Sequence, residues 1–220
     1  MRIPDIKAIT VIGAGLMGHG IAQEFAVAGY SVRLHDVSEE RLDQALSRID
    51  VNLDLLHQHG LLAQGLQAAV RGRIITTTDL KQAADGADLV IEAVFEDIAV
   101  KHEVFSRLET LAPEHTILAS NTSTFMPSRL AEATHRPDRV LVTHYFNPPY
   151  LLPLVEVVGS PATAPEVIEA VVALLNAVGK RPTVLKREVP GFVVNRLQVA
   201  LLREAVSLVQ QGVASPQDID

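Results

Sequence analysis

The sequence contains no cysteine among its 220 residues. This absence excludes disulfide bonds, thiolate metal sites and cysteine nucleophiles, and it fits a reducing cytosol. An excess of basic residues is also missing, because 19 Lys and Arg stand against 26 Asp and Glu, for a formal net charge of -7. A chain with this balance lacks a broad basic surface for nucleic acid or an anionic membrane, so we expect neither as a partner.

Long hydrophobic runs are absent as well. No uninterrupted apolar stretch approaches the roughly 20 residues that span a bilayer, and the segment Met1-Arg2-Ile3-Pro4-Asp5 lacks the apolar core of a secretory signal. We therefore expect a cytoplasmic protein, in which the glycosylation sequon Asn121-Thr122-Ser123 is accidental. Hydrophobic residues nevertheless make up 48% of the chain, which is enough for a large core in one or two domains.

Short β-branched runs alternate with helix-length amphipathic segments from Lys7 onward. This alternation is typical of βαβ units, so we predict an α/β fold with a doubly wound, mainly parallel sheet. The predicted strands span residues 8–12, 31–36, 74–76, 89–92, 116–120, 139–143, 154–158 and 182–185. Apolar residues three and four apart predict two helices with one buried face each, made by Val100, Val104, Leu108 and Leu111 and by Val167, Val171, Leu174, Leu175 and Val178.

The end of the chain has a different character. Pro190-Gly191 interrupts the alternation, and residues 192–211 predict a long apolar helix with no evident partner in the chain. Residues 214–218 look like the start of another helix. We therefore expect residues 1–188 to form one domain and residues 189–220 to begin an all-helical domain. The rest of that helical domain is expected to be missing from this chain or supplied by another subunit.

A glycine-rich turn follows the first predicted strand and opens a helix. It reads Gly13-Ala14-Gly15-Leu16-Met17-Gly18, which is the GxGxxG pattern in the context that dinucleotide binding requires. The helix N-terminus offers free N–H groups to the phosphates. Asp36 ends the next strand, where a carboxylate binds both ribose hydroxyls and repels a 2′-phosphate. The pattern predicts a Rossmann domain that binds NAD; Arg33 or Arg41 close to Asp36 would shift the balance toward NADP.

A histidine, His144, ends another apolar strand and precedes the loop 145–149 at the carboxyl edge of the sheet, where open α/β folds bind ligands. Histidine suits removal of a hydroxyl proton near neutral pH, as hydride transfer from an alcohol requires. Glu156 lies inside the apolar run 154–158, where an ionised carboxylate needs a partner. We infer a buried His144–Glu156 pair with a catalytic role; a purely structural ion pair is the alternative.

Two further polar sites are expected near the same crevice. Ser120-Asn121-Thr122-Ser123 follows a strand end, although turns and caps use the same residue types. Asn195 shares a helix face with apolar residues, so we expect it to bind a buried partner or a ligand. A helix cap near Gly191 is the alternative.

These motifs together resemble the L-3-hydroxyacyl-CoA dehydrogenase family. The similarity covers essentially the whole chain, through residues 13–20, 90–97, 120–123, 144–148, 154–157 and 190–196. The resemblance implies a hydride transfer from C3 of an L-3-hydroxyacyl-CoA to NAD, as in the β-oxidation of fatty acids. It also implies a homodimer formed through a helical C-terminal domain.

The resemblance implies roles for named residues of this chain. His144 would act as the general base, oriented by Glu156, while Ser123 and Asn195 would position the substrate oxygen and the nicotinamide. Glu96 and Lys101 would contact the nicotinamide-side ribose, with Asn121 near the ring.

The substrate class stays open between two branches of this family. Members that bind the CoA nucleotide usually carry lysines after the second strand, whereas residues 52–59 read Asn-Leu-Asp-Leu-Leu-His-Gln-His. The loop 147–154 is similar to the L-gulonate 3-dehydrogenase (lambda-crystallin) branch, so a small free 3-hydroxy acid is the alternative substrate. The match of residues 92–96 and 120–123 favours the CoA thioester.

Three other functions are weighed against a dehydrogenase. A serine hydrolase lacks the GxSxG elbow here and leaves the dinucleotide pattern unexplained. The closely spaced His57 and His59 favour a solvated helix face over a metal site, so no metal is expected. A non-catalytic NAD-binding or structural protein is the remaining alternative, and the pairing of His144 with Glu156 argues against it.

Overall fold

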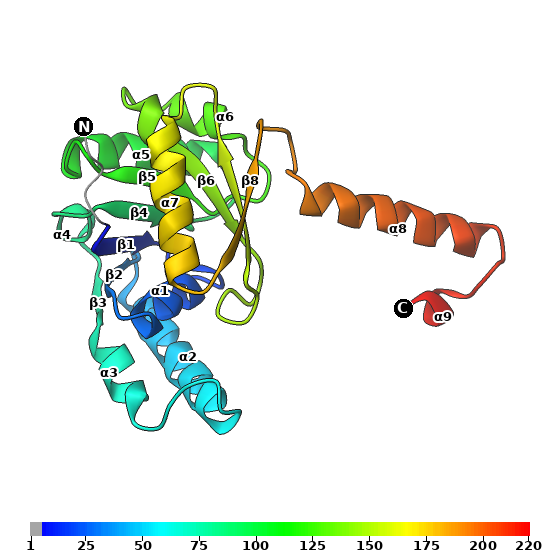
Figure 1. Cartoon of the computed structure of the whole chain (residues 1–220), viewed down its shortest axis with the longest axis horizontal. Helices are drawn as coiled ribbons and strands as arrows, with labels where there is room; N and C mark the ends of the chain where they lie inside the picture. The colour runs from blue at the N-terminus through cyan, green and yellow to red at the C-terminus, as the bar shows by residue number, and fades with distance from the viewer. Residues whose placement is uncertain (1–5) are drawn as a thin grey trace.

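A computed structural model describes residues 6–220, within which eight strands form one sheet (Figure 1). The strand order is β3-β2-β1-β4-β5-β6-β7-β8. The strands are β1 (Ala8–Ile12), β2 (Ser31–His35), β3 (Ile74–Thr77), β4 (Leu89–Glu92), β5 (Ile117–Ser120), β6 (Val140–Tyr145), β7 (Leu154–Gly159) and β8 (Arg181–Leu185). Only β7 pairs antiparallel, with β6, in this sheet. The predicted doubly wound, mainly parallel sheet is confirmed, and the strand order reverses between β1 and β4, where such folds bind ligands.

Helices cover both faces of the sheet. The helices of the chain are α1 (Gly18–Val27), α2 (Glu39–Gln58), α3 (Leu66–Gly72), α4 (Leu80–Ala84), α5 (Ile98–Leu111), α6 (Pro127–Ala131), η1 (Pro137–Arg139), α7 (Pro165–Ala177), α8 (Val194–Gln210) and α9 (Pro216–Ile219), of which α8 and α9 lie away from the sheet (Figure 1). One core cluster joins the sheet to α1, α2 and α7, and a second joins it to α4, α5 and α6. Alternation along β1 explains the two cores, because Ile9 and Val11 belong to the first and Ile12 to the second.

The buried face of α5 differs from the predicted one. Lys101, Phe105 and Leu108 are buried, whereas Val100 is 39% exposed. Val100 and Val104 line a cavity at the edge of the sheet. The prediction was wrong at Val100 because apolar spacing does not distinguish a helix face that packs on a core from one that borders a cavity. The predicted face of α7 is buried at Val167, Val171, Leu174 and Leu175.

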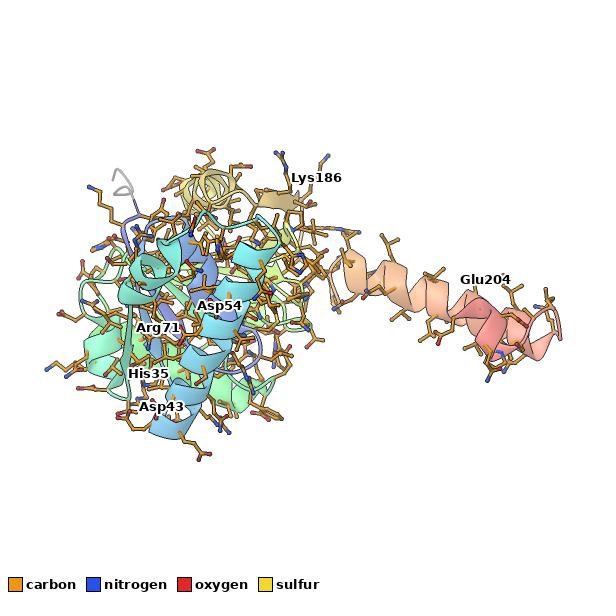
Figure 2. The ribbon with its side chains drawn as sticks, turned by 90° about the horizontal axis from the view of Figure 1, so that it is seen from below. His35, Asp43, Asp54, Arg71, Lys186 and Glu204 are labelled. Carbon is orange, nitrogen blue, oxygen red and sulfur yellow. The ribbon has the colours of Figure 1, made fainter. Side chains whose placement is uncertain are left out.

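The helix α8 projects away from the sheet domain (Figure 1), and Figure 2 shows its side chains, Glu204 among them, standing clear of it. None of its residues is buried, and its large apolar side chains Leu197, Val199, Leu201, Leu202 and Val206 are exposed. Its N-terminus is nevertheless anchored, because Phe192, just before it, is 0% exposed within the second core cluster. No helix among residues 6–220 is long and apolar enough to cross a membrane.

Candidate functional site

The glycine turn between β1 and α1 depends on its glycines. Gly13 has φ +100°, and a Cβ there would lie 2.6 Å from the carbonyl oxygen of Ala93. A Cβ on Gly18 would lie 1.7 Å from the carbonyl oxygen of Gly13. Gly15 faces open space, because a Cβ there would meet no atom within 4 Å. The turn is therefore packed tightly against the β4 loop on one side and open on the side where a pyrophosphate would lie.

A cavity of about 570 Å³, here called the first cavity, opens at the carboxyl ends of β1, β2, β4 and β5. Its lining includes Gly13, Gly15, Leu16, Met17, Asp36, Arg41, Glu96, Asn121 and Ser123. Most of the residues that the sequence assigns to cofactor binding thus lie around one space. Gly18 and Lys101 do not line it.

Asp36 ends up buried and fixed beside the glycine turn. Its side chain is 6% exposed, and Oδ2 accepts a hydrogen bond from the Ala14 backbone N–H at 2.9 Å. Arg41 Nη1 lies 4.0 Å from Oδ1 and is largely exposed. Arg33 is occupied elsewhere, since its Nη1 donates to the carbonyl oxygen of Asp85. Asp36 therefore holds the turn and presents a carboxylate acceptor at the cavity wall, which fits the ribose hydroxyls of NAD.

His144 and Glu156 face each other across the antiparallel β6–β7 pair. Their side chains are 5% and 1% exposed, and His144 Nδ1 lies 2.8 Å from Glu156 Oε2. The other carboxylate oxygen accepts from the backbone N–H groups of Val193 and Val194 at 2.9 and 3.0 Å. Because a carboxylate can only accept, Nδ1 carries the proton and Nε2 is left as the basic nitrogen.

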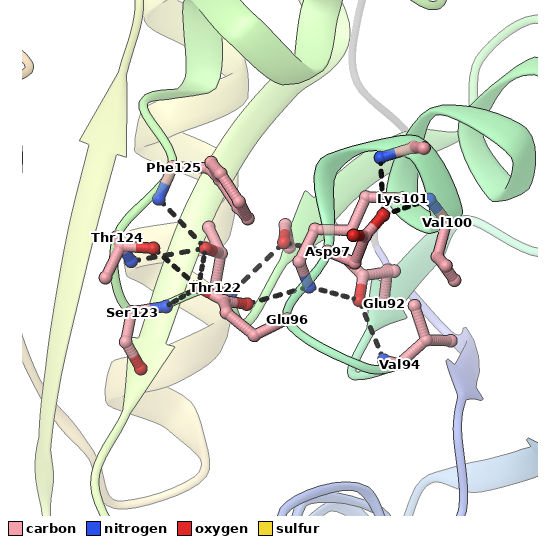
Figure 3. A network of polar contacts seen from close by, with 12 residues as sticks. Glu92, Val94, Glu96, Asp97, Val100, Lys101, Thr122, Ser123, Thr124 and Phe125 are labelled. Atoms are coloured by element: carbon pink, nitrogen blue, oxygen red, sulfur yellow. Dashed lines mark hydrogen bonds and ion pairs between the residues drawn. The ribbon is translucent and has the colours of Figure 1, made fainter.

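Glu96 organises the loop after β5, as Figure 3 shows. Its Oε1 accepts from Thr122 Oγ1 at 2.5 Å, from the Ser123 backbone N–H at 3.0 Å and from Thr124 Oγ1 at 2.9 Å. Burial acts to raise the pKa of Glu96, but hydrogen bonds from Thr122 and Thr124 and the charge of Lys101 outweigh it and lower the pKa. Glu96 is thus an ionised acceptor at the wall of the first cavity.

Lys101 lies beneath Glu96 and away from the cavity. It is 1% exposed, with Nζ 2.8 Å from Glu92 Oε1 and 3.1 Å from Glu96 Oε2 (Figure 3). Glu92 is 0% exposed and also accepts from Ser120 Oγ at 2.6 Å and from the Val94 backbone N–H at 2.7 Å. This network of Glu92, Ser120 and Lys101 is not among the features predicted from the sequence. The acidic residue that ends the apolar strand Leu89–Glu92 is the sequence signal that could have indicated it.

The remaining predicted residues are tied into the same region. Asn121 Oδ1 accepts from the Tyr145 backbone N–H at 2.9 Å, which links β5 to the residue after His144. Asn195 Nδ2 donates to the Ser123 carbonyl oxygen at 3.0 Å. The α8 N-cap is Val193 and has no side-chain cap bond, so Asn195 does not cap the helix. His57 Nδ1 lies 3.2 Å from the Leu62 carbonyl oxygen, and residues 6–220 hold no cluster of three or more metal-ligating side chains.

Comparison with known proteins gives two adjacent family matches and close relatives. The NAD-binding domain of 3-hydroxyacyl-CoA dehydrogenase matches residues 8–189, and the C-terminal domain matches residues 191–220. The chain is 42% identical to human mitochondrial hydroxyacyl-coenzyme A dehydrogenase, covering 98% of this chain and 70% of the relative. It is 39% identical to 5-formyl-3-hydroxy-2-methylpyridine 4-carboxylate 5-dehydrogenase of Mesorhizobium japonicum, covering 98% and 69%. The structure of (S)-3-hydroxybutyryl-CoA dehydrogenase from Ralstonia eutropha superposes with a TM-score of 0.92 at 34% identity, covering 98% and 75%.

Proposed function

This chain belongs to the 3-hydroxyacyl-CoA dehydrogenase family and is an NAD-dependent oxidoreductase, and from that premise we propose that it interconverts an L-3-hydroxyacyl-CoA and its 3-oxoacyl-CoA. The observation that carries the proposal is the buried His144–Glu156 pair. It is tied to the first cavity through the next residue, Tyr145, whose backbone N–H donates to Asn121 at the cavity wall. NAD, when bound, would accept the hydride that leaves C3 of the substrate.

His144 acts as the general base in this proposal. With Nδ1–H held by Glu156, the lone pair of Nε2 takes the C3 hydroxyl proton as the hydride leaves. Glu156 then stabilises the imidazolium, and the two backbone N–H groups on its other oxygen hold the carboxylate in place. The proton returns to the oxygen in the reverse reaction.

Ser123 and Asn195 position the reacting groups. The Ser123 hydroxyl lies on the wall of the first cavity, where it donates to the substrate oxygen. Asn195 holds the Ser123 carbonyl oxygen and so fixes this loop against the start of α8. The α8 segment, through Asn195 and the N–H groups before it, is therefore part of the site.

Glu96 and Asn121 hold the nicotinamide half of the cofactor. The Glu96 side chain is partly exposed at the wall of the first cavity, where it accepts a hydrogen bond from a ribose hydroxyl. Lys101 contributes through Glu96 as a positioning residue, because its ammonium is buried between two carboxylates. Asn121 lies at the same wall, fixed by Tyr145.

A small free 3-hydroxy acid is the second candidate substrate, and one observation favours it. The α2 segment 52–59, where CoA-binding members carry lysines, has none here. One relative of this chain is named for a pyridine carboxylate substrate. A homodimer formed through α8 and the residues after it, and a place in fatty-acid oxidation, belong to the thioester proposal.

NADH formation separates the two candidates. The chain is assayed with NAD and L-3-hydroxybutyryl-CoA, free L-3-hydroxybutyrate or L-gulonate in parallel. Turnover of the thioester alone supports the proposal and shows that lysines on α2 are dispensable. Turnover of a free acid alone moves the chain to the small-acid branch. No turnover of any substrate, with NADH still bound, contradicts both and supports a non-catalytic NAD-binding role.

A further inference from the structure

The loop that follows His144 is held against the cofactor helix α1 by residues to which the proposed reaction gives no role. This loop spans residues 146–153, between β6 and β7. Phe146 begins it, and the centroid of its ring lies 4.5 Å from that of the His144 imidazole. The position of the loop therefore bears directly on the position of the base.

The loop has few hydrogen-bond donors of its own. Pro148, Pro149 and Pro153 have no backbone N–H. The N–H groups of Leu151 and Leu152 both donate to the Pro148 carbonyl oxygen, at 3.1 and 3.0 Å. The carbonyl oxygens of Pro149 and Leu152 accept instead from a side chain outside the loop. The loop is thus fixed in part by a donor from another element.

That donor is Lys180, in the turn between α7 and β8, which Figure 1 shows beside α1. Its side chain is 3% exposed, and Nζ lies 2.5 Å from Glu24 Oε1 on α1. Nζ also donates to the carbonyl oxygens of Pro149 and Leu152 at 2.5 and 2.9 Å. An ammonium group has three N–H donors, so each of them has an acceptor here. Lys180 therefore ties the loop to the cofactor helix and has no donor left for another partner.

Gly20 makes a second contact between α1 and the loop. A Cβ at this position would lie 2.6 Å from Pro149 Cγ and 3.2 Å from Tyr150 Cδ1. Because the first distance is too short for a real Cβ, only glycine lets the helix and the loop meet without a shift. Two separate elements, α1 through Gly20 and the α7–β8 turn through Lys180, thus fix the position of Pro149.

We propose that Lys180 is a positioning residue for hydride transfer, which sets the place of His144 relative to the bound cofactor by holding the loop against α1. This inference rests on the proposed dehydrogenase function. The base lies at the start of the loop and the cofactor lies at the glycine turn before α1. The distance between them therefore depends on what joins the loop to α1, and a misplacement of about 1 Å lowers a rate by as much as about 100-fold.

Lys180→Met removes the ammonium and keeps the length of the side chain. Burial raises the pKa of Glu24 to about 7 against the hydrogen bond and charge of Lys180. Without Lys180 that pKa lies higher still, so Glu24 is neutral near pH 7 and the variant leaves no buried charge unpaired. The affinity for NADH should be unchanged, because no residue of the loop lines the first cavity.

A stopped-flow measurement of the first turnover separates positioning from loss of folded protein. The enzyme–NADH complex is mixed near pH 7 with saturating acetoacetyl-CoA, or with the oxo acid if the wild type turns over the free acid. Deuteration of NADH at C4 identifies the hydride-transfer phase. Lys180→Met should lower the rate constant of this phase about tenfold or more at full amplitude. A purely structural role would lower the amplitude, which counts active enzyme, and leave the rate constant unchanged.

Matched variants test the same loop from other directions. Gly20→Ala displaces the loop without altering a charge and should also lower the rate constant, whereas Gly72→Ala, a helical glycine with open space around it, should not. Glu24→Gln keeps an oxygen acceptor for Nζ and should lower the rate constant less than Lys180→Met does. Lys186→Met, at an exposed lysine after β8, should change nothing. If Lys180→Met does not fold, Gly20→Ala and Glu24→Gln decide the outcome.

Hydrogen exchange of residues 146–154 measures the loop without turnover. Exchange should be faster in Lys180→Met and Gly20→Ala than in the wild type. Unchanged exchange in both variants, or unchanged rate constants in both, overturns the positioning role. If the wild type turns over no substrate, the proposed function fails and the role in hydride transfer with it, while exchange still decides whether Lys180 fixes the loop. If the wild type and both variants turn over substrate at equal rates, only the present inference fails.

Discussion

At the scale of single residues, the hydrogen bond from His144 to Glu156 fixes the orientation of the base before any substrate arrives. Glu156 has no spare oxygen, since one oxygen binds His144 and the other binds two backbone N–H groups. The imidazole is therefore held in one tautomer, and its orientation does not have to be selected during the reaction. Removal of the ring should affect the chemical step and leave the first cavity intact.

We expect His144→Gln to lower kcat at least about 100-fold, within the usual range for loss of a general base. The affinity for NADH should stay nearly unchanged, because His144 is not among the residues that line the first cavity. Steady-state NADH formation and a fluorescence titration with NADH measure the two quantities. His135→Gln, on an exposed loop histidine, is the control. Wild-type turnover in His144→Gln would remove this residue from the mechanism.

Asp36→Ala should weaken NAD binding and relax the discrimination against NADP. The carboxylate both repels a 2′-phosphate and accepts the Ala14 N–H within the glycine turn, so its loss acts on selectivity and on the turn. Asp36→Asn retains an acceptor without the charge and should separate the two effects. Dissociation constants for NADH and NADPH are compared by fluorescence. An unchanged ratio of the two constants in both variants would contradict the assignment.

Lys101→Met should be strongly destabilising even though Lys101 does not line the first cavity. It would leave the fully buried Glu92 without its cation, and breaking a buried pair from one side costs about 3–5 kcal/mol. Urea unfolding measures the loss, with the exposed Lys81→Met as the matched control. The double variant Glu92→Gln with Lys101→Met should recover part of the stability. Equal stability of Lys101→Met and wild type would show that the contact between Lys101 and Glu92 does not stabilise the fold.

Glu92 and Glu156 show how far the sequence could predict this site. Both lie in short apolar strands, and both are buried with hydrogen-bond partners. A partner for Glu156 was predictable because the sequence has a histidine, His144, at the end of another apolar strand. The partner of Glu92 is a lysine on the next helix, whose stripe of apolar neighbours predicts a different buried face. The rule that a buried carboxylate needs a partner identifies the residue but not where its partner comes from.

At the scale of elements, the strands were predictable because alternation and β-branched runs depend on local sequence, and the predicted ranges all meet a strand of the sheet. What local sequence could not predict is how distant elements are tied together. Lys180, before β8, is an example: its Nζ contacts Glu24 on α1 at 2.5 Å and the carbonyl oxygens of Pro149 and Leu152 at 2.5 and 2.9 Å. This buried contact connects the cofactor helix α1 with the loop that follows His144.

Glu24 makes the stability of this junction depend on pH. Burial raises the pKa of Glu24 to about 7, against the hydrogen bond and charge of Lys180, from an ordinary value of 4.5. The folded protein therefore holds a proton that the unfolded chain releases between these two values, so the free energy of unfolding should fall as pH rises through this window. Above pH 7 the loss is complete, and below 4.5 it is absent.

Glu24→Gln should flatten that dependence. The amide does not titrate, so the decline in unfolding free energy across the window should be smaller than in wild type, by an amount on the order of 1–3 kcal/mol. Urea unfolding at several pH values measures it. Glu169→Gln, an exposed carboxylate on α7, should follow the wild-type curve. Parallel curves for wild type and Glu24→Gln would show that Glu24 has an ordinary pKa in the folded protein.

At the scale of the whole molecule, the boundary between the sheet domain and the helical segment does not coincide with the boundary of the site. The sequence places a domain end at residue 188, and the family match changes between residues 189 and 191. Residues 192–195 belong to the sheet domain in physical terms. Phe192 is buried in its second core cluster, the N–H groups of Val193 and Val194 bind Glu156, and Asn195 binds the Ser123 loop.

Two truncations test this division. A chain ending at residue 188 loses the buried Phe192 ring and leaves one oxygen of Glu156 without donors, so it should be less stable than the full chain by at least about 3 kcal/mol. A chain ending at residue 197 keeps these contacts and removes residues 198–220, none of which is buried, so its unfolding free energy and NADH affinity should match those of the full chain. Urea unfolding of the three chains gives the comparison. If the two truncated chains are equally stable, residues 192–195 do not contribute to the stability of the sheet domain. The position of Glu156 would then depend on His144 alone.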